Sequence, residues 1–350
     1  MQPLAVFKQN SLAAAASGIL LLYAVTSAAN AAGSAPVVEP PYKLSVFAKG
    51  GPGVSQPDSL VLWRDTVLVG YGNGVAKDGS DGKSSTIVQY SLTGTERRRF
   101  SVKGHNDGLR LVGQNELWAL QNEDANPNLV VIDLQSGAQT KFSFPRTPHG
   151  GGYDDIAIMN GHVFISASNP TPNSKGINVF PALLEVASLA GGTVHLQAVL
   201  SGDAHATDIP TGKEVTLNLT DPDSLAVDQR GNIVLDSQAD DELVFVRDPD
   251  TSVQSAHLLK IKDTTGKLIT VDDTAFATVP NSVMLVSDLK ANAVYRIEEP
   301  GLGFEPGVAY SASDTAGFVG QLNLDNGVLT PIATGFGSMR GVIFVPPAKK

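Results

Sequence analysis

The chain has 350 residues, and its 35 acidic side chains outnumber its 25 Lys and Arg side chains, which gives a formal net charge of −10. Such an acidic surface repels the phosphates of nucleic acids and of anionic membranes, so we expect neither as a partner. The sequence contains no cysteine, which excludes disulfides, thiol catalysis and thiolate metal sites.

The first residues have the features of an export signal. Lys8 lies in a short n-region, residues 11–27 are apolar or small, and Ala29-Asn30-Ala31 fits a cleavage site. A membrane anchor is the alternative, but the apolar core at residues 19–25 is short beside the roughly 20 residues that a membrane span needs. We therefore predict a signal peptide at residues 1–31 and a periplasmic or secreted product that is free of the membrane after cleavage.

The remaining sequence predicts a single all-β domain. Residues 32–41 form a Pro-rich spacer, and no linker divides residues 42–346. The chain contains 35 Gly and 21 Pro and has few helical patterns, which is typical of short strands joined by many turns.

The most regular stretch lies at residues 220–248, where three apolar runs separated by polar turn residues indicate an antiparallel meander. It opens with Asp221-Pro222-Asp223. Related openings precede other strand-like runs, at Asp58-Ser59-Leu60, Asn106-Asp107-Gly108-Leu109, Tyr153-Asp154-Asp155-Ile156, Val271-Asp272-Asp273-Thr274 and, with Arg in place of Asp, Ser338-Met339-Arg340-Gly341.

Strand-like runs follow each opening. In chain order they are 66–70, 86–91 and 98–102; 116–120, 129–133 and 140–144; 162–166, 182–187 and 194–200; 233–235, 243–246 and 256–261; and 282–286 and 293–297 in the unit that opens at Val271. After residue 297 the pattern loosens, and the order of the strand-like runs at 307–312, 318–324, 328–333 and 342–345 is left open.

The spacing of the openings predicts a β-propeller. The anchors Asp58, Asp107, Asp155, Asp223, Asp273 and Arg340 are 49, 48, 68, 50 and 67 residues apart. A four-stranded unit of this length buries both its faces only when neighbours stack on it radially. Six openings predict six blades, and five blades with an irregular closing segment are the alternative. Residues 44–48 lack a local partner, and we expect this N-terminal strand to close the ring beside the C-terminal strands.

The repeat also resembles a known family. An acidic or small residue before an apolar strand, then Gly231-Asn232-Ile233-Val234-Leu235-Asp236, is similar to the NHL-type repeat. More broadly, residues 44–345 resemble the six-bladed propellers that include SMP-30/gluconolactonase proteins, paraoxonases and streptogramin lyases. The resemblance implies a divalent cation, usually calcium, in the central channel, and often hydrolysis of lactones or esters. The Glu-Gly-Pro opening of the gluconolactonase branch is absent, and Asn106 is the main counterpart of that branch's Asn-rich ligand set.

The repeated aspartates are the candidate metal ligands. Residues that precede the inner strands of a propeller converge on the channel mouth, where several carboxylates need a cation or strong hydrogen bonds. Calcium accepts six to eight oxygen ligands in loose geometry. The predicted ligands are Asp58, Asn106, Asp107, Asp155, Asp223 and Asp273. The alternative is that each Asp caps its own turn by accepting backbone N–H groups.

Two histidines are candidates for catalysis. His105 and His149 lie just before the second and third openings, so either could act as a general base at the channel rim. The alternative is that each satisfies a loop carbonyl.

These features support two functions. The first is a calcium-dependent lactonase or esterase-like hydrolase, and the second is a non-enzymatic propeller that binds a small-molecule ligand or another exported protein. In either case we expect a monomer.

Overall fold

The computed structural model describes residues 35–278, 281–301 and 303–348. The predicted signal peptide and the first residues of the spacer lie outside this part of the chain. The described residues form β-strands, turns and one short 3₁₀ turn at Gln238–Asp240, so the all-β prediction is confirmed. Within the described ranges, no helix is long and apolar enough to cross a membrane.

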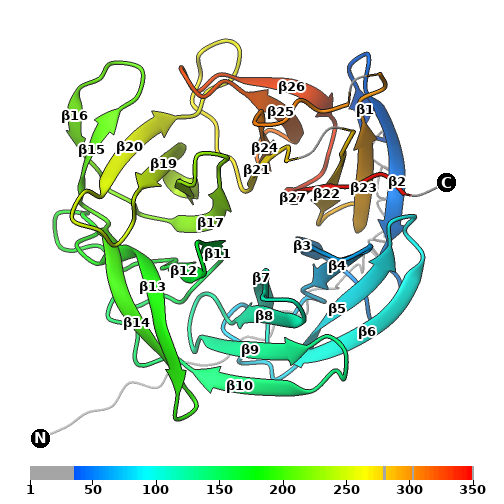
Figure 1. Cartoon of the computed structure of the whole chain (residues 1–350), viewed down its shortest axis with the longest axis horizontal. Helices are drawn as coiled ribbons and strands as arrows, with labels where there is room; N and C mark the ends of the chain where they lie inside the picture. The colour runs from blue at the N-terminus through cyan, green and yellow to red at the C-terminus, as the bar shows by residue number, and fades with distance from the viewer. Residues whose placement is uncertain (1–34, 279–280, 302, 349–350) are drawn as a thin grey trace, which may run out of the picture. The chain divides into compact units, whose positions relative to one another are not determined.

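Figure 1 shows the sheets of residues 35–348 arranged around a common centre. One sheet contains β3 (Pro57–Trp63), β4 (Thr66–Tyr71), β5 (Ser84–Ser91) and β6 (Glu96–Lys103) in sequential order. The next sheet has eight strands: β7 (Asn106–Val112), β8 (Glu116–Gln121), β9 (Asn128–Asp133), β10 (Gln139–Ser143), β11 (Ile156–Met159), β12 (His162–Ser166), β13 (Pro181–Ala190) and β14 (Thr193–Ser201). Its two halves meet at a parallel contact of Ser143 with Thr193.

A third sheet contains β17 (Pro222–Val227), β18 (Ile233–Ser237), β19 (Glu242–Arg247) and β20 (Ser255–Lys260). The long insertion ahead of it forms the hairpin of β15 (His205–Asp208) and β16 (Glu214–Thr216), which extends this sheet beside β20. A fourth sheet contains β21 (Thr274–Phe276), β24 (Ala309–Ser313), β25 (Phe318–Leu322), β26 (Leu329–Thr334) and the short β1 (Val37–Val38).

The last sheet joins both ends of the described chain. Its order is β2 (Lys43–Lys49), β23 (Ala293–Glu298), β22 (Val283–Asp288) and β27 (Met339–Val345). The N-terminal strand β2 is antiparallel to β23, with Leu44 opposite Ile297. The N-terminal strand β2 thus forms one edge of the sheet whose other edge is the final strand β27.

One assignment from the sequence is wrong. The runs at 282–286 and 293–297 were expected in the same unit as the opening at Val271, but β22 and β23 pair with β27 and β2, whereas β21 pairs with β24. The chain therefore leaves the fourth sheet after β21, adds two strands to the last sheet, and then returns. The two sheets share one core in which Met284 and Val286 pack with Tyr310 and Val319, so burial is satisfied by this exchange.

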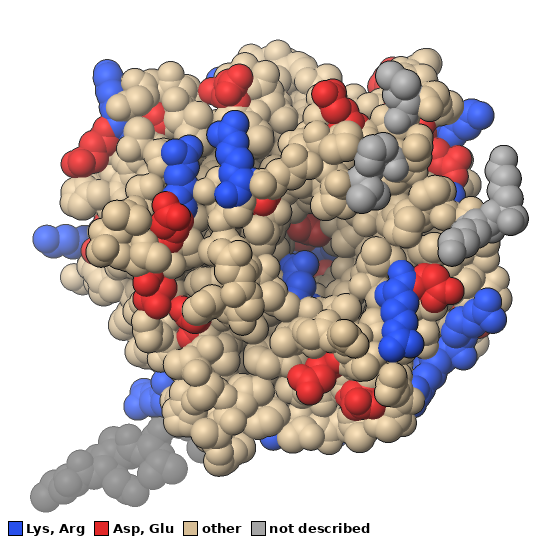
Figure 2. Space-filling view, viewed as in Figure 1, with Lys and Arg blue, Asp and Glu red and all other residues tan. Residues whose placement is uncertain are grey.

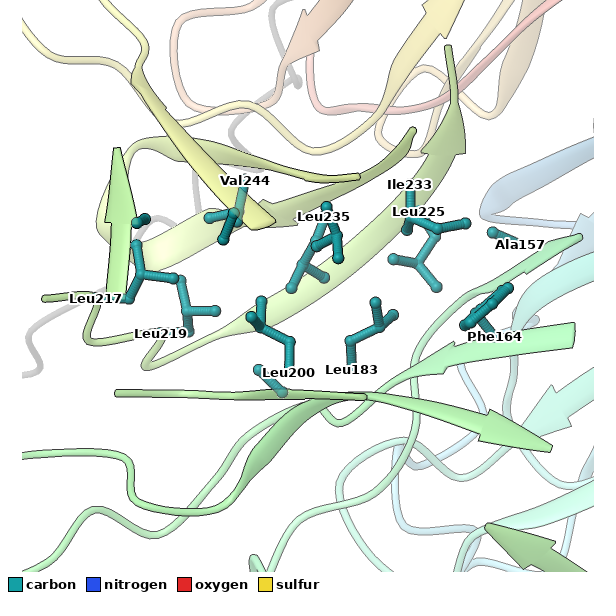
Figure 3. Packing of buried hydrophobic residues seen from close by; sticks show 14 of the residues in the cluster. Ala157, Phe164, Leu183, Leu200, Leu217, Leu219, Leu225, Ile233, Leu235 and Val244 are labelled. Carbon is teal, nitrogen blue, oxygen red and sulfur yellow. The ribbon is translucent and has the colours of Figure 1, made fainter. Parts of the chain in front are cut away.

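Packing between neighbouring sheets makes the core. Figure 3 shows such a cluster, in which Phe164, Leu183 and Leu200 from the β11–β14 half-sheet meet Leu225 and Leu235 of the next sheet. Because each strand alternates its side chains between two faces, each sheet presents apolar residues to both neighbours. This radial packing holds the innermost strand of each unit next to the centre, where the candidate site lies. These innermost strands, called first strands below, are β3, β7, β11, β17, β21 and β27.

Candidate metal centre

In three of the sheets the acidic opening lies in a bulge at the start of the innermost strand. In the first sheet the register shifts between Pro57 and Leu60, and the two residues between them are Asp58 and Ser59. The same shift contains Asp107-Gly108 in β7 and Asp223-Ser224 in β17. A bulge re-aims the side chains that it contains, and here it directs the first residue of each pair toward the centre.

A shared backbone hydrogen bond aligns the units. In each of five units, a backbone carbonyl accepts an N–H from the end of the second strand, and the residue two positions after that carbonyl has the same place in every unit. The pairs are Gly72 to Gln56 (2.9 Å), Asn122 to His105 (2.8 Å), Ser168 to Gly152 (3.2 Å), Gln238 to Asp221 (2.9 Å) and Leu289 to Ser338 (2.8 Å). The pairing of Thr274 with Ser311 places the remaining unit in the same frame.

The equivalent residues are therefore Asp58, Asp107, Asp154, Asp223, Asp272 and Arg340. Two anchors chosen from the sequence, Asp155 and Asp273, are displaced by one residue from this frame. Their carboxylates instead link neighbouring first strands. Asp155 Oδ2 accepts the N–H of Leu225 (3.0 Å), and Asp273 Oδ2 accepts the N–H of Val342 (2.7 Å). Asp155 and Asp273 therefore accept backbone N–H groups, as the capping alternative predicts, but these groups belong to the adjacent sheet and not to their own turn.

A central cavity of about 640 Å³ runs along the first strands. Figure 2 shows the hollow at the centre of this face, with acidic and basic atoms inside it. The lining includes Asp58, Asp107, Asp154, Asp155, Asp221, Asp223, Asp272, Asp273, Glu123 and Asp124, together with His105, Lys77, Arg110 and Arg340. Acidic groups outnumber cationic ones, so the cavity concentrates negative charge as the repeat predicted.

Two predicted site residues do not line this cavity. Asn106 is 1% exposed, and its Nδ2 donates to the carbonyl of Leu120 (3.2 Å). Its Oδ1 occupies the space left by Gly70 and has no hydrogen-bond partner among the described residues. His149 is 2% exposed and its Nε2 contacts the Gly152 carbonyl at 2.8 Å. Burial lowers the pKa of His149, which keeps the ring neutral. Both geometries are those of structural residues within a loop or between strands.

The carboxylates that line the cavity lie close to one another and are partly withdrawn from solvent. Burial raises the pKa of Asp58 to about 6, although Arg340 opposes the rise. Burial also raises the pKa of Asp154 well above its ordinary value, and the neighbouring Asp223 carboxylate adds to that effect. For Asp223, burial and the charge of Asp272 act in the same direction. Ionised carboxylates in this setting favour a proton or a cation.

Three side chains form the candidate metal cluster. His105, Asp107 and Glu123 each offer one ligand atom, and these atoms lie within 4.8 Å of one another. Asp107 is 8% exposed, and its Oδ2 has no hydrogen-bond partner among the described residues. Burial of an unpaired carboxylate oxygen costs free energy. A bound cation or a proton would reduce this cost, because no described protein atom pairs with Asp107 Oδ2.

The sequence patterns did not predict Glu123, which lies in the loop after β8. Glu123 follows β8 and belongs to no repeated frame, and its only sequence signal is the acidic pair Glu123-Asp124 next to a strand end. His105 lies beside it because its backbone carbonyl accepts the N–H of Asn122. Its ring Nδ1 contacts the carbonyl of Val75 at 3.1 Å. Since a carbonyl only accepts, Nδ1 carries the proton and Nε2 of the neutral ring carries the lone pair.

The donor set is compatible with calcium through its oxygens. Asp107 and Glu123 supply carboxylates, and Asp154 and Asp223 line the same cavity. An imidazole nitrogen is an uncommon calcium ligand, so His105 Nε2 would remain free beside the ion, whereas a transition metal would take it as a ligand.

Comparison with known proteins places the chain among distant structural neighbours. No protein-family model matches it, and no curated protein matches it. It is similar to a periplasmic gluconolactonase of Pseudomonas aeruginosa, with 13% identity, a TM-score of 0.49, and coverage of 85% of this chain and 92% of that one. It is also similar to virginiamycin B lyase from Staphylococcus aureus (10% identity, TM-score 0.47, 88% and 90% covered).

A third neighbour is the calcium-binding protein regucalcin from Agrobacterium tumefaciens, with 12% identity, a TM-score of 0.45, and coverage of 87% of this chain and 84% of that one. These neighbours fall in the groups that the sequence repeat resembles. At such identities and TM-scores, the likeness carries no information about the reaction.

Proposed function

We propose that the chain is an exported six-bladed propeller that binds a divalent cation, calcium, in its central cavity and hydrolyses small lactones or esters. The blade number is supported by contacts between successive first strands around the centre, β3 with β7, β7 with β11, β11 with β17, β17 with β21, β21 with β27, and β27 with β3. Ring closure by β2 is supported by its pairing in the sheet of β27. Export is supported by the sequence of residues 1–31.

The observation that carries the cation site is the buried, unpartnered Oδ2 of Asp107 beside Glu123 and His105. A divalent cation would satisfy this oxygen and offset the repulsion among the carboxylates that line the cavity. Asp107 and Glu123 would hold the ion. Asp155 and Asp273 are less suited as ligands, because each already accepts a backbone N–H of the neighbouring first strand.

The residues around the cluster suit ester or lactone hydrolysis. A bound cation would supply a Lewis acid that polarises the carbonyl oxygen of the substrate. His105 Nε2 would accept the proton of the attacking water, since the contact of Nδ1 with Val75 fixes the tautomer. A channel carboxyl with a raised pKa, such as Asp58, could return a proton to the leaving alkoxide.

A non-enzymatic binding propeller is the second candidate. Asp272 is paired with Arg340 and also accepts from Gln238 Nε2 at 2.8 Å, so part of the acidic lining is committed to protein contacts. In this case the cavity would take a small-molecule ligand, and the protein would be a monomer without hydrolytic activity.

Calcium titration calorimetry and a panel of lactones and aryl esters, assayed with calcium and with chelator, test the proposal. We expect calcium binding and chelator-sensitive hydrolysis in the parent. Asp107→Asn, which removes a charge while keeping the side-chain shape, should abolish both. Asp250→Asn makes the same change on the exposed surface and should alter neither. Calcium binding without turnover of any substrate would favour the binding propeller.

A further inference from the structure

We propose that Lys77 is a built-in counter-cation of the His105–Asp107–Glu123 cluster, which a divalent cation must displace in order to bind. The inference rests on the proposed cation site and adds the residue that sets its affinity. Lys77 comes from the loop between β4 and β5, on a neighbouring sheet, and its ammonium forms an ion pair with the Glu123 carboxylate. Glu123 is one of the two carboxylates of the cluster.

The loop that carries Lys77 is held against the cluster by several contacts. The carbonyl of Val75 contacts His105 Nδ1 at 3.1 Å, and Asn126 Nδ2 donates to the carbonyl of Asp78 at 3.4 Å. Asp81 Oδ2 accepts the N–H of Ala76 at 3.1 Å, which closes the loop on itself. The loop between β4 and β5 therefore positions Lys77 next to Glu123, and the same loop contacts His105 through Val75.

Backbone geometry adds to this placement. Gly79 has a φ of 66°, and a Cβ there would lie 2.4 Å from Asn122 Oδ1. The residue next to Glu123 thus occupies the space that a side chain at position 79 would need. The acidic segment Asp78-Gly79-Ser80-Asp81 resembles a calcium loop in composition, but its carboxylates accept N–H groups of Ser80, Ala76 and Lys83. Its role is to shape the loop that positions Lys77.

The ammonium of Lys77 compensates only part of the cluster. Its side chain is 58% exposed and Glu123 is 7% exposed, so the lysine reaches the carboxylate from the solvent side. Asp107 Oδ2, in the same cluster, has no hydrogen-bond partner among the described residues. A single charge on a long flexible side chain satisfies one carboxylate, whereas a divalent cation can contact both at once. Lys77 can swing into solvent when the ion enters, because its exposed stem allows it to move.

This arrangement makes the parent a weaker cation binder than its carboxylates alone would be. Entry of an ion breaks the Lys77–Glu123 pair and brings two positive centres close together. Both effects oppose binding. Replacement of Lys77 by a neutral residue should therefore strengthen calcium binding, in contrast to the usual loss that follows mutation near a site.

The test is calcium calorimetry on the whole mature protein as the parent and as Lys77→Gln, Lys77→Arg and Lys83→Gln. We expect Lys77→Gln to tighten calcium binding by about five- to tenfold, because a competing charge beside the ion is lost while solvent screens part of its effect. Lys77→Arg should stay within about threefold of the parent, because arginine keeps the charge. Lys83 is the matched control, since it lies in the same loop and pairs with Asp81 away from the cluster.

A double-mutant cycle of Lys77→Gln and Glu123→Gln, measured by urea denaturation in chelator, gives a second readout without metal. We expect the two changes to couple, so that the stability lost with Lys77→Gln is largely restored by Glu123→Gln. Equal calcium affinity in the parent and in Lys77→Gln, or additive effects in the cycle, would overturn the inference and leave the proposed function standing.

The remaining outcomes separate the inference from the proposed function. Calcium binding by Lys77→Gln but not by the parent would support the inference and would contradict calcium-dependent activity of the parent. Absence of binding in both variants would overturn the cation site and, with it, the displacement of Lys77.

Discussion

Two sides of the central cavity begin from the same position of the repeat and differ in how their carboxylates are compensated. Asp272 and Arg340 occupy equivalent positions on the two sheets that exchange strands, and they form a buried ion pair to which Gln238 adds a hydrogen bond. Asp107 occupies the same position in β7, and its Oδ2 has no partner among the described residues. Arg340 is the counterion of Asp272 on one side of the cavity. On the other side, Lys77 pairs with Glu123, and Asp107 is left for a bound cation.

Asp107 and Asp272 show that aspartates at the same position of the repeat can have different partners, so the position alone does not define a metal ligand. All six equivalent residues line the central cavity, but neighbouring residues decide whether a carboxylate becomes part of a structural pair or remains available. At the β21–β27 junction the repeat has Arg340 in place of Asp, and its charge acts on both Asp272 and Asp58. At β7 the neighbours are His105 and Glu123, and these add potential ligands.

Removal of Arg340 should have the largest effect on stability. Arg340→Met leaves Asp272, which is 5% exposed, as an uncompensated buried charge. Breaking a buried pair costs about 3–5 kcal/mol, and we expect about 3 kcal/mol because the Arg340 side chain is 27% exposed. Urea denaturation at pH 7 measures this loss, and the double variant with Asp272→Asn should recover part of it. A loss below about 1 kcal/mol would mean that solvent already screens the pair.

Asp107→Asn and Asp272→Asn should differ in how much calcium stabilises them against unfolding. At about 100 times its dissociation constant, calcium should stabilise the parent by about 2.7 kcal/mol through mass action. Asp107→Asn should remove most of this gain, while its stability in chelator changes little because Asp107 Oδ2 has no partner to lose. Asp272→Asn should be destabilising both with and without calcium, since it loses the Arg340 pair. Thermal melts of the two variants in calcium and in chelator check both expectations; an equal calcium gain in all three proteins contradicts the site.

Much of the fold could be predicted because its strands follow local patterns. Period-two alternation and turn residues located strands in every sheet, and the spacing of the openings indicated stacked four-stranded units. The partner of a strand is not encoded in the same way. β22 and β23 contribute to a core that both adjacent sheets share, so burial alone does not choose between the sheets, and only the pairing with β27 and β2 shows which one they join.

The candidate site could be predicted in part. Asp58, Asp107 and Asp223 each stand at the aligned position, whereas Asp154-Asp155 and Asp272-Asp273 offer two acidic residues, and in both pairs the predicted residue is one position away from the structural frame. Glu123 was missed because it belongs to no repeat.

The two histidines show the same limit. His105 and His149 both lie shortly before an opening, yet only His105 lines the cavity, and His149 is buried where the chain passes close to another loop. A Cβ on Gly152 would lie 1.8 Å from the carbonyl oxygen of Glu123. This close approach is a tertiary feature and leaves no signal in the spacing.

The stability of the parent in chelator should rise as the pH falls from about 7 to about 5. Burial raises the pKa of both Asp58 and Asp221 to about 6, above the value of about 3.9 expected in the unfolded chain. Over this window the folded state binds protons that the unfolded state does not, so each group contributes up to about 1.4 kcal/mol per pH unit.

Urea denaturation at several pH values checks this trend. Asp58→Asn should flatten the profile, and saturating calcium should flatten or reverse it, because the ion favours the charged carboxylates. A stability that falls steadily from pH 7 to pH 5 in chelator would contradict the raised pKa values.

The smallest expected effect concerns Asp155, whose carboxylate bridges two sheets. Asp155→Asn keeps an oxygen that can accept the N–H of Leu225 and loses the charge that pairs with Arg110, whose Nη2 lies 2.9 Å from Asp155 Oδ2. Arg110 retains the carbonyls of Ile156 and Leu225 as acceptors, so we expect a loss of about 0.5–1 kcal/mol. Asp155→Ala also leaves the Leu225 N–H without a partner and should cost about 1–3 kcal/mol more. Both losses should be the same in calcium and in chelator when measured by urea denaturation. Dependence of either loss on calcium would instead make Asp155 a ligand, as the sequence first suggested, and would extend the cation site from β7 toward β11.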